Sequence, residues 1–289
     1  MLQAEVPVYT PATLAEARRM LQEGGTRPVA GGTDAMVRFK DGIWRPMAWV
    51  SLHRLRGELA YIHEDGDWLE VGALTTFSEL LASRVIRERA PLLAKAVRTI
   101  GGPAIRNMGT LGGNIGTASP AGDSLPALYA LDADVIVNGV TSTSVAELMI
   151  GPGRLKLLVG DLITGVRFRA QAPDELCTFE KLGLRAAHAI SLASVAVRLA
   201  PSMARVALGA VAPTVIRVPD AEAALVAGHA AAAVVAAQEA ARPISDVRAS
   251  AEYRRAMAGN LLLRGLMRML GPEAATAQRL VPPIGGGSQ

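Results

Sequence analysis

A glycine-dense stretch from Thr99 to Leu128 is the first part of this sequence whose residue types could do chemistry. The stretch reads TIGGPAIRNMGTLGGNIGTASPAGDSLPAL and has seven glycines between Gly101 and Gly122. Glycine lets backbone N–H groups converge on one point, because no side chain stands in the way. The polar side chains of the stretch include those of Thr110, Asn114, Thr117 and Ser119. A large, polar, phosphate-bearing ligand would satisfy these groups, and a buried loop satisfied by its own contacts and by water is the alternative.

A second glycine turn, VAGGTD, runs from Val29 to Asp34. It follows an expected strand and precedes an expected helix, and converging N–H groups at such a junction bind phosphate oxygens. An ordinary tight turn is the alternative. Two separate turns of this kind favour a ligand with an extended pyrophosphate, which is the shape of a dinucleotide. The turn lacks the third glycine of the G-x-G-x-x-G fingerprint, which disfavours a Rossmann nucleotide site.

Composition excludes several other classes of function. A chain of 289 residues predicts two or three compact units. Aromatic residues make up only 4% of the chain, and 30 basic residues stand against 26 acidic ones, which disfavours a nucleic-acid partner. The single cysteine, Cys177, excludes an internal disulfide and any cysteine-held cluster or zinc site within this chain.

The apolar stretches predict neither a signal peptide nor a membrane span. The N-terminal MLQAEVPVYTPATLAEA has no basic region followed by an apolar core, and AALVAGHAAAAVVAAQEAA is mostly alanine and contains His, Gln and Glu. We therefore expect no membrane association and a cytoplasmic location.

The elements that must position the glycine turns are short strands and helices. We expect a strand over VPVY, a helix over TLAEARRMLQEGG and a second strand over RPVA. Thr13 and Glu16 have the spacing of a capping box, which should open the helix. ELAYIHED and DWLEVGA should form a hairpin around Asp65–Asp67. The capping-box spacing of Thr76 and Glu79 should open two short helices broken at Pro91. For Thr99–Leu128 we expect neither helix nor strand.

The rest of the chain predicts a sheet followed by helices. ADVIVNG and DLITGVRF are expected strands of the first part, and QAPD at Gln171–Asp174 is a connection. ELCTFEKLG, AISLASVAVRLA and ARVALGAVA predict three antiparallel strands. Two helical stretches, DAEAALVAGHAAAAVVAAQEAA and SAEYRRAMAGNLLLRGLMRML, follow them.

These segments also carry a family resemblance. YTPATLAEARRMLQEGGTRPVAGGTDAMVRFKDG, VGALTTFSELLAS, IGGPAIRNMGTLGGNIGTASPAGDSLPALYALDADV and FEKLGLRAAHAISLASVAVRL resemble, in this order, the FAD-binding medium subunit of the molybdenum hydroxylases. This is the family of xanthine dehydrogenase and carbon monoxide dehydrogenase. The resemblance extends to ALGAVAPTVIRVPDAEAAL and covers nearly the whole chain.

The resemblance implies an α+β flavoprotein fold of the vanillyl-alcohol-oxidase type. Two FAD-binding subdomains would span residues 1–55 and 56–170, and a C-terminal domain with a three-stranded antiparallel sheet and helices would span 175–280. It also implies a set of FAD contacts. The turn around the pyrophosphate would be Val29, Ala30, Gly31, Gly32, Thr33 and Asp34, and the second cradle would be Thr110, Leu111, Gly112, Gly113 and Asn114.

Four further positions match cofactor contacts of the family. Ile100 matches a position close to the flavin, Asp123 matches a carboxylate that hydrogen-bonds the cofactor, and Ile163 and Lys181 match later contacts near it. Some relatives place an aromatic ring at the position of Ile100, so stacking of the flavin on an aromatic ring there is not expected. We expect no catalytic side chain, because the sequence offers no Ser-His-Asp set and no obvious acid–base pair with its own substrate site. We expect no metal site either, because no metal-ligand cluster is evident among His53, His63, His188 and His229.

The function that the resemblance implies is electron transfer. A large subunit would hold the molybdopterin cofactor, a small subunit would hold two [2Fe-2S] clusters, and electrons would reach FAD in this chain and leave to NAD⁺, oxygen or another acceptor. The expected assembly is a dimer of heterotrimers. The single cysteine excludes the extra [4Fe-4S] loop of some relatives, such as 4-hydroxybenzoyl-CoA reductase. A stand-alone flavin oxidoreductase of the same fold and a cofactor-free scaffold subunit are the alternatives.

Overall fold

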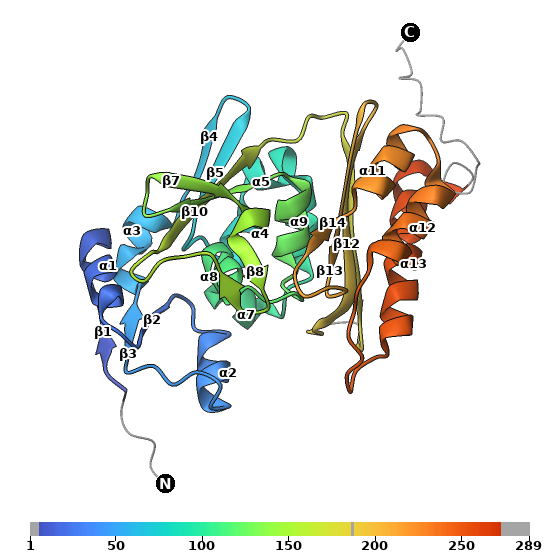
Figure 1. The fold of residues 1–289 in the computed structure, drawn as a ribbon. Helices are drawn as coiled ribbons and strands as arrows, with labels where there is room; N and C mark the ends of the chain where they lie inside the picture. The colour runs from blue at the N-terminus through green and yellow to red at the C-terminus, as the bar shows by residue number, and fades with distance from the viewer. Residues whose placement is uncertain (1–5, 186–187, 273–289) are drawn as a thin grey trace. The chain divides into compact units, whose positions relative to one another are not determined.

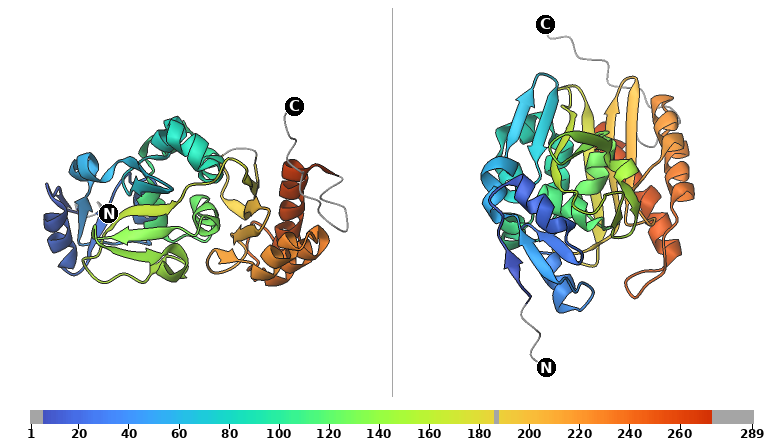
Figure 2. Two further views of the ribbon diagram at one scale, coloured as in Figure 1. Left: turned by 90° about the horizontal axis from the view of Figure 1, so that it is seen from above. Right: turned by 60° about the vertical axis from the view of Figure 1, so that its left-hand side comes forward.

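The computed structural model describes residues 6–185 and 188–272, which form two compact units (Figures 1 and 2). The first unit takes its described residues from Met1–Arg87, Ile100–Ser119 and Asp132–Ala170. The second unit comprises the described residues of Glu88–Thr99, Pro120–Leu131 and Gln171–Gln289. Two short pieces of the expected 56–170 subdomain therefore pack with the C-terminal part of the chain.

The first unit opens with a small parallel sheet. Strands β1 (Val8–Tyr9), β3 (Ala48–Ser51) and β2 (Thr26–Val29) lie in the order β1-β3-β2. Helix α1 (Leu14–Gln22) connects β1 to β2, and the Thr13 hydroxyl accepts a hydrogen bond from Glu16 N–H at its start. This helix buries Ala17 and Leu21 in one apolar cluster. Because β2 ends at Val29 and helix α2 (Ala35–Lys40) begins six residues later, the glycine turn fills the gap between them.

The second sheet of this unit has five antiparallel strands. Their order is β4 (Ile62–Asp65), β5 (Trp68–Gly72), β10 (Ile163–Arg169), β6 (Asp134–Val137) and β7 (Thr141–Ser144). The expected β4–β5 hairpin is present, with Gly66 at φ +59° in its turn. The pairing of β10 with β6 shifts register between Ile163 and Gly165. Short elements complete the unit: η1 (His53–Leu55), α3 (Arg56–Leu59), α10 (Val145–Leu148), β8 (Met149–Gly151) and β9 (Arg154–Leu155).

The capping box at Thr76 and Glu79 forms as expected, and it opens three helices rather than two. These are α4 (Phe77–Ala82), α5 (Arg84–Arg89) and α6 (Pro91–Arg98). The first break comes at Ser83, whose φ of −67° and ψ of 126° are extended. The second lies before Pro91, which occupies the first position of α6.

The expectation that Thr99–Leu128 contains neither helix nor strand is wrong. The segment folds into α7 (Pro103–Met108), α8 (Leu111–Thr117) and α9 (Ser124–Ala130). Local signals start two of these helices, because Pro103 is the first residue of α7 and the Thr110 hydroxyl caps α8. Only α8 contains glycines, and each of them costs about 1 kcal/mol relative to alanine in a helix. Burial of its Leu111 and Ile115 side chains, both 0% exposed, offsets this cost.

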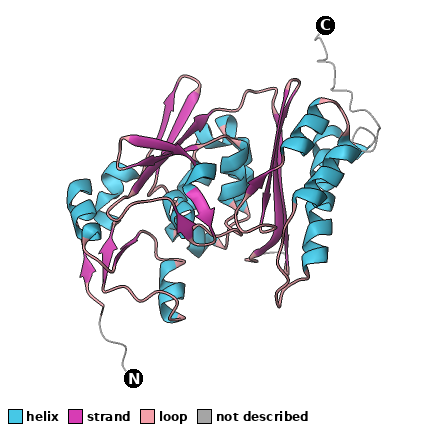
Figure 3. Cartoon of the chain, viewed as in Figure 1, coloured by secondary structure: helices cyan, strands magenta, loops and turns pink. Residues whose placement is uncertain are grey.

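The second unit is built on a long antiparallel sheet. It has the order β11 (Leu176–Gly183), β12 (Ser191–Ala200), β13 (Met203–Gly209) and β14 (Ile216–Arg217), so the three expected strands are extended by a two-residue fourth (Figure 3). The first expected helical stretch divides at Gly228, which has φ +80°, into α11 (Pro219–Val226) and α12 (Ala230–Ala240). Helix α13 (Ala251–Leu270) is the second stretch.

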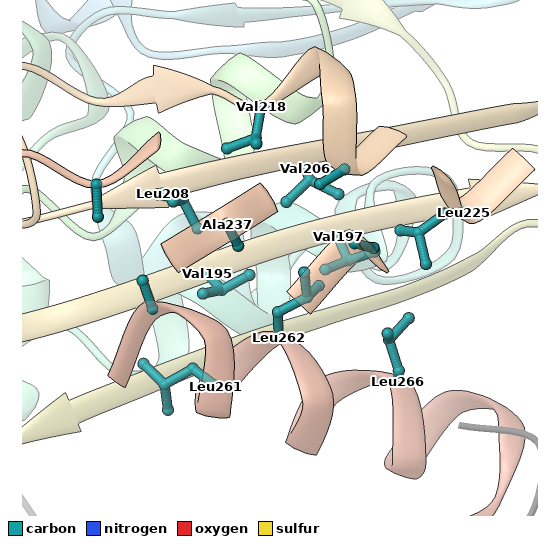
Figure 4. Packing of buried hydrophobic residues seen from close by; sticks show 14 of the residues in the cluster. Val195, Val197, Val206, Leu208, Val218, Leu225, Ala237, Leu261, Leu262 and Leu266 are labelled. Carbon is teal, nitrogen blue, oxygen red and sulfur yellow. The ribbon is translucent and has the colours of Figure 1, made fainter. Parts of the chain in front are cut away.

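Helices cover both faces of this sheet. Val195 and Val197 of β12 face a core completed by Leu225 of α11 and by Leu262 and Leu266 of α13 (Figure 4). Since successive strand residues point to opposite faces, Ser194 and Ala196 point the other way. On that side a Cβ added at Gly209 of β13 would lie 2.4 Å from Ser194 Oγ and 2.7 Å from Pro126 of α9.

Candidate functional site

The turn predicted to wrap a pyrophosphate has a run of N–H groups without a protein acceptor. Within the turn and the start of α2, Met36 N–H donates to Gly32 O and Arg38 N–H donates to Asp34 O, each at 3.0 Å. Among the described residues, no acceptor receives a hydrogen bond from the backbone N–H groups of Gly31, Gly32, Thr33, Asp34 and Ala35. Consecutive N–H groups on a glycine-containing turn at a strand–helix junction are a typical phosphate site.

Glycine is needed at the two positions of this turn for different structural reasons. Gly32 has φ +70°, a left-handed conformation that costs other residues about 1–2 kcal/mol. Gly31 instead allows close approach, because a Cβ at this position would lie 1.6 Å from the carbonyl oxygen of Met108 and 3.1 Å from Gly109 N. The turn thus contacts the residues just before Thr110, and the fold brings the two predicted glycine segments together within the first unit.

The second predicted cradle, at Thr110–Asn114, already uses its N–H groups within the chain. Leu111 N–H donates to Thr75 O at 3.0 Å, and Gly112 N–H donates to Ala73 O at 2.9 Å. The hydroxyl of Thr110 accepts from Gly113 N–H at 3.0 Å, and its carbonyl accepts from Asn114 N–H at 3.0 Å. The expected convergence of free amides is therefore absent at Thr110–Asn114 as the structure describes it, and at this segment a ligand would meet side chains and the exposed backbone of Gly113.

The glycines of this second segment also differ in purpose. A Cβ at Gly112 would lie 2.5 Å from Ala73 Cβ, so this glycine lets α8 pack against the end of β5. A Cβ at Gly113 would meet only Thr110 Oγ1, at 2.9 Å, and Gly116 has nothing within 4 Å. Packing alone therefore explains Gly112, while Gly113 stays available for a ligand.

Two predicted apolar positions lie in the first unit. Ile100 is 9% exposed and stands in the turn before α7, where the Arg106 side chain holds its carbonyl. Ile163 is 8% exposed and opens β10, where it pairs with Val137 of β6. Their assignment as flavin neighbours remains a prediction.

Asp123 and Lys181 form a buried ion pair in the second unit. Lys181 Nζ lies 2.5 Å from Asp123 Oδ2 and donates a second hydrogen bond to Thr99 O at 3.2 Å. Ser191 Oγ donates to the other carboxylate oxygen of Asp123 at 2.5 Å. The Asp123 carboxylate stands at the start of α9, where the helix end has a positive partial charge. The Lys181 ammonium contacts the end of α6, where the partial charge is negative. The pair thus has a structural role of its own.

Burial has the largest influence on the pKa of the Asp123 carboxyl. It raises the pKa of Asp123, while Lys181 and the Ser191 hydroxyl act in the opposite direction without cancelling the effect of burial. Ser191, which is 1% exposed, was not identified as a site residue from the sequence. No motif marks it, because only the packing of α9 against β12 brings it near Asp123.

A separate groove of about 780 Å³ lies on the five-stranded sheet and contains none of the predicted residues. Inside it the Tyr61 hydroxyl donates to Glu70 Oε1 at 2.5 Å, and burial together with Glu70 raises the pKa of Tyr61. The Arg167 guanidinium stacks over the Trp68 ring, 4.8 Å from its centroid. These polar groups therefore have partners in the protein.

Two further properties apply to residues 6–185 and 188–272. No group of three or more His, Cys, Asp and Glu side chains there could hold a metal ion. None of the helices found there is long and apolar enough to cross a membrane.

Comparison with known proteins gives matches over most of the chain. Residues 3–168 match the family described as FAD binding domain in molybdopterin dehydrogenase, and residues 178–269 match the CO dehydrogenase flavoprotein C-terminal domain. The chain is 33% identical over 193 residues to the nicotinate dehydrogenase FAD-subunit of Eubacterium barkeri, which covers 64% of this chain and 65% of that subunit. It is 31% identical over 223 residues to the xanthine dehydrogenase FAD-binding subunit of Escherichia coli O157:H7, covering 73% and 76% respectively.

A solved structure agrees with these matches. Carbon monoxide dehydrogenase from Hydrogenophaga pseudoflava, in a form that lacks the Mo-pyranopterin moiety of its molybdenum cofactor, contains a chain that superimposes with a TM-score of 0.87. The sequences are 28% identical, and the match covers 93% of this chain and 98% of that one. The expected fold class is thereby confirmed.

Proposed function

The chain belongs to the family of FAD-binding medium subunits of molybdenum hydroxylases, and on this premise we propose that it holds FAD as the electron-transfer subunit of such a complex. As a member of this family it is an oxidoreductase subunit. The observation that carries the proposal is the run of N–H groups on the Gly31–Ala35 turn that find no acceptor in the described part of the chain, inside the matched FAD-binding domain. Five adjacent donors next to a second glycine segment suit the oxygens of a pyrophosphate.

In this proposal each predicted FAD-contact residue has a defined role in binding the cofactor. Gly31, Gly32 and Thr33 would bind phosphate oxygens through N–H groups, with Val29, Ala30 and Asp34 completing the turn. Thr110 and Gly113 would border the same ligand, while Leu111 and Gly112 fix the segment against Thr75 and Ala73. Ile100 and Ile163 would supply apolar contacts near the flavin. The domain boundaries proposed with this assignment are 1–55, 56–170 and 175–280.

Asp123 and Lys181 are proposed as the polar cofactor contacts of the second unit. Asp123 has both oxygens engaged by protein donors, so it keeps its orientation without the ligand. A carboxylate held in this way can accept a further hydrogen bond, because two oxygens offer about four lone-pair directions.

The chemistry comes from the cofactor, and this chain supplies binding and electrostatics. FAD, when bound, takes up electrons and passes them to an acceptor. The residues of this chain would bind the pyrophosphate, orient the ring system and keep the turn backbone fixed. Neither substrate hydroxylation nor a metal centre is assigned to this chain.

We propose that the partners are a large subunit with the molybdopterin cofactor and a small subunit with two [2Fe-2S] clusters. Electrons would enter from the clusters and leave to an external acceptor. The proposed assembly is a dimer of heterotrimers in the cytoplasm, where a chain with one cysteine needs no disulfide. The proposal is supported by the relatives, which are named as FAD subunits of nicotinate and xanthine dehydrogenases.

Reconstitution with FAD tests the cofactor assignment. The full chain, freed of ligand and incubated with FAD, should retain one flavin per chain after gel filtration, measured by visible absorbance against protein concentration. FMN and riboflavin are the matched ligands, because they lack the pyrophosphate that the turn should bind. Equal retention of riboflavin and FAD, or a chain that retains no flavin, would contradict the proposal.

Isolation of the native complex tests the partners. Pull-down of this chain from its source should yield one subunit with molybdopterin and one with [2Fe-2S] clusters, identified by mass spectrometry and metal analysis. A chain that is reproducibly monomeric in its source and passes no electrons would argue for another role.

A further inference from the structure

We propose that Arg106 is a positioning residue of the flavin site, which orients and polarises the N–H groups of Gly101 and Gly102 toward the cofactor. This inference rests on the proposed function, because it assigns a task at the turn where Ile100 is expected to lie near the flavin. Arg106 was not among the residues singled out from the sequence.

One atom of Arg106 holds two consecutive carbonyl groups. Its Nη1 donates to Ile100 O at 2.9 Å and to Gly101 O at 2.8 Å. The donor lies on α7, and the two acceptors precede the start of that helix at Pro103. Both carbonyls therefore converge on the same side of the backbone.

The direction of the N–H groups follows from the planar trans peptide bond. In such a bond the N–H of one residue points opposite to the C=O of the residue before it. Gly101 N–H therefore points away from the Ile100 carbonyl, and Gly102 N–H points away from the Gly101 carbonyl. Since both carbonyls converge on Arg106, both N–H groups emerge on the opposite side of the turn.

These two N–H groups have no acceptor among the residues that the structure describes. In the part of the chain that the structure describes, neither Gly101 N–H nor Gly102 N–H donates to an acceptor, and Gly102 is buried. A buried N–H without a partner costs free energy, so such groups are normally satisfied by a ligand, by water or by the protein. Two adjacent donors that face away from a guanidinium can both point at electron-rich atoms of a ligand.

The backbone of the turn depends on glycine. Gly101 has φ +42°, and a Cβ there would lie 2.7 Å from Ile105 Cβ. Without a side chain, the residue keeps its carbonyl within reach of Arg106 and its N–H accessible from the other side. The guanidinium charge also polarises both peptide groups, which strengthens their N–H donors.

The expected ligand atoms are the ring nitrogen and carbonyl oxygens of the isoalloxazine. These atoms gain negative charge when a flavin is reduced, so N–H donors directed at them stabilise the reduced form more than the oxidised form. Loss of Arg106 should weaken FAD binding and lower the midpoint potential of bound flavin. Donors directed only at the pyrophosphate would leave the potential unchanged.

The test compares Arg106→Met with Arg87→Met in the full chain. Arg87 makes the same type of contact elsewhere, because its Nη1 donates to Leu81 O at 3.0 Å and to Ala82 O at 2.7 Å. Both variants lose one arginine that holds two consecutive carbonyls, and only one of these arginines adjoins the proposed flavin turn. The measurements are FAD affinity by calorimetry, the visible circular dichroism of bound FAD, the midpoint potential, and thermal unfolding of the ligand-free chain.

Arg106→Met should raise the Kd for FAD about tenfold to a hundredfold, as expected for loss of two oriented hydrogen bonds. It should also lower the midpoint potential and change the visible dichroism, whereas Arg87→Met should leave all three as in the wild type. Arg106→Lys keeps the charge without the planar fork and should be intermediate, which also provides a folded variant if Arg106→Met fails to fold.

Two outcomes would overturn the inference. Unchanged potential and dichroism in both Arg106 variants, with only thermal stability reduced, would make Arg106 a purely structural residue. Equal effects of Arg106→Met and Arg87→Met on the flavin would do the same. If the wild-type chain binds no FAD, the proposed function fails together with this inference, whereas wild-type binding with an unaffected Arg106 variant overturns this inference alone.

Discussion

The backbone of Gly31 contacts the carbonyl of Met108, and a Cβ on Gly31 would lie 1.6 Å from that oxygen. Residues 77 positions apart in the sequence are thereby held against each other without any side chain on one of them. This contact joins the turn with the unpaired N–H groups to the start of the second glycine segment. The glycine pair at 31 and 32 therefore combines a packing requirement with a conformational one.

Gly31→Ala should destabilise the chain whether or not FAD is present. The added methyl group meets backbone, which cannot move aside like a flexible side chain, so we expect a loss of at least about 2 kcal/mol. Urea unfolding of the ligand-free chain measures this. Gly57→Ala is the matched control, because nothing lies within 4 Å of the added Cβ and the residue lies in α3. Equal stability of the two variants would contradict the close approach at Gly31.

Gly32→Val should abolish FAD retention. The substituted residue must hold φ +70°, and its branched side chain would stand beside the N–H groups that we assign to the pyrophosphate. Flavin content after reconstitution measures the effect. Gly66→Val imposes similar strain at φ +59° in the β4–β5 hairpin and should keep one FAD per chain. Stoichiometric flavin on Gly32→Val would show that the turn has been assigned wrongly.

Lys181→Met should destabilise the chain by about 3–5 kcal/mol, because it leaves the Asp123 carboxylate buried without its counter-ion. The side chains of Lys181 and Asp123 are only 12% and 8% exposed. The double variant Asp123→Asn with Lys181→Met should be less destabilised than the sum of the single variants. Denaturant unfolding of all four chains measures the coupling, and strict additivity would indicate that the two groups do not interact.

The stability of the same Lys181→Met variant should depend on pH in a defined direction. Burial raises the pKa of Asp123, and removal of Lys181 takes away the strongest influence that lowers it. A carboxyl group whose folded pKa is raised stabilises the fold below its unfolded pKa of about 4, and this contribution is lost as the pH rises through the folded pKa. The stability deficit of Lys181→Met should therefore be smaller near pH 4 than near pH 8. The double variant, which lacks the carboxyl, should show no such trend.

Glu79 should contribute a pH dependence of the opposite sign. Burial alone would raise the pKa of its carboxyl, but hydrogen bonds from Thr76 and the Arg56 guanidinium outweigh it, so the pKa lies below its usual value. The stabilisation by Glu79 is present above its unfolded pKa of about 4.3 and is lost as the pH falls through the folded pKa. At pH 7 the free energy of unfolding of the wild type should exceed that of Glu79→Gln by about 1 kcal/mol or less. The difference is small because 46% of the Glu79 side chain is exposed to screening solvent.

The measurement for Glu79 is urea unfolding between pH 7 and pH 3. The difference between wild type and Glu79→Gln should shrink as the pH falls. Glu147→Gln, on the short helix α10, controls for the loss of one carboxylate outside the capping box. A difference that is constant with pH would mean that the Thr76 hydrogen bonds do not depend on the charge of Glu79.

Local signals in the sequence determined much of the fold. Thr13, Thr76 and the Asp65–Asp67 turn act within a few residues of themselves, and the structure places a cap or a hairpin at each. The ordered motifs of the family extended this to the fold class, which the comparisons confirm. The sequence also identified the Val29–Asp34 turn as a ligand candidate, since a glycine pair after a strand is a local pattern.

Only the tertiary structure decided which backbone groups of the glycine segments are free. The N–H groups of Leu111 and Gly112 donate to Thr75 and Ala73, more than thirty residues away in the sequence. Those of the first turn have no such acceptor within residues 6–185 and 188–272. Ser191 reaches the Asp123 carboxylate in the same way, because the two residues are 68 positions apart and no spacing rule joins them. Capping and turn formation depend on neighbours along the chain, whereas the pairing of a backbone donor depends on which segment packs against it.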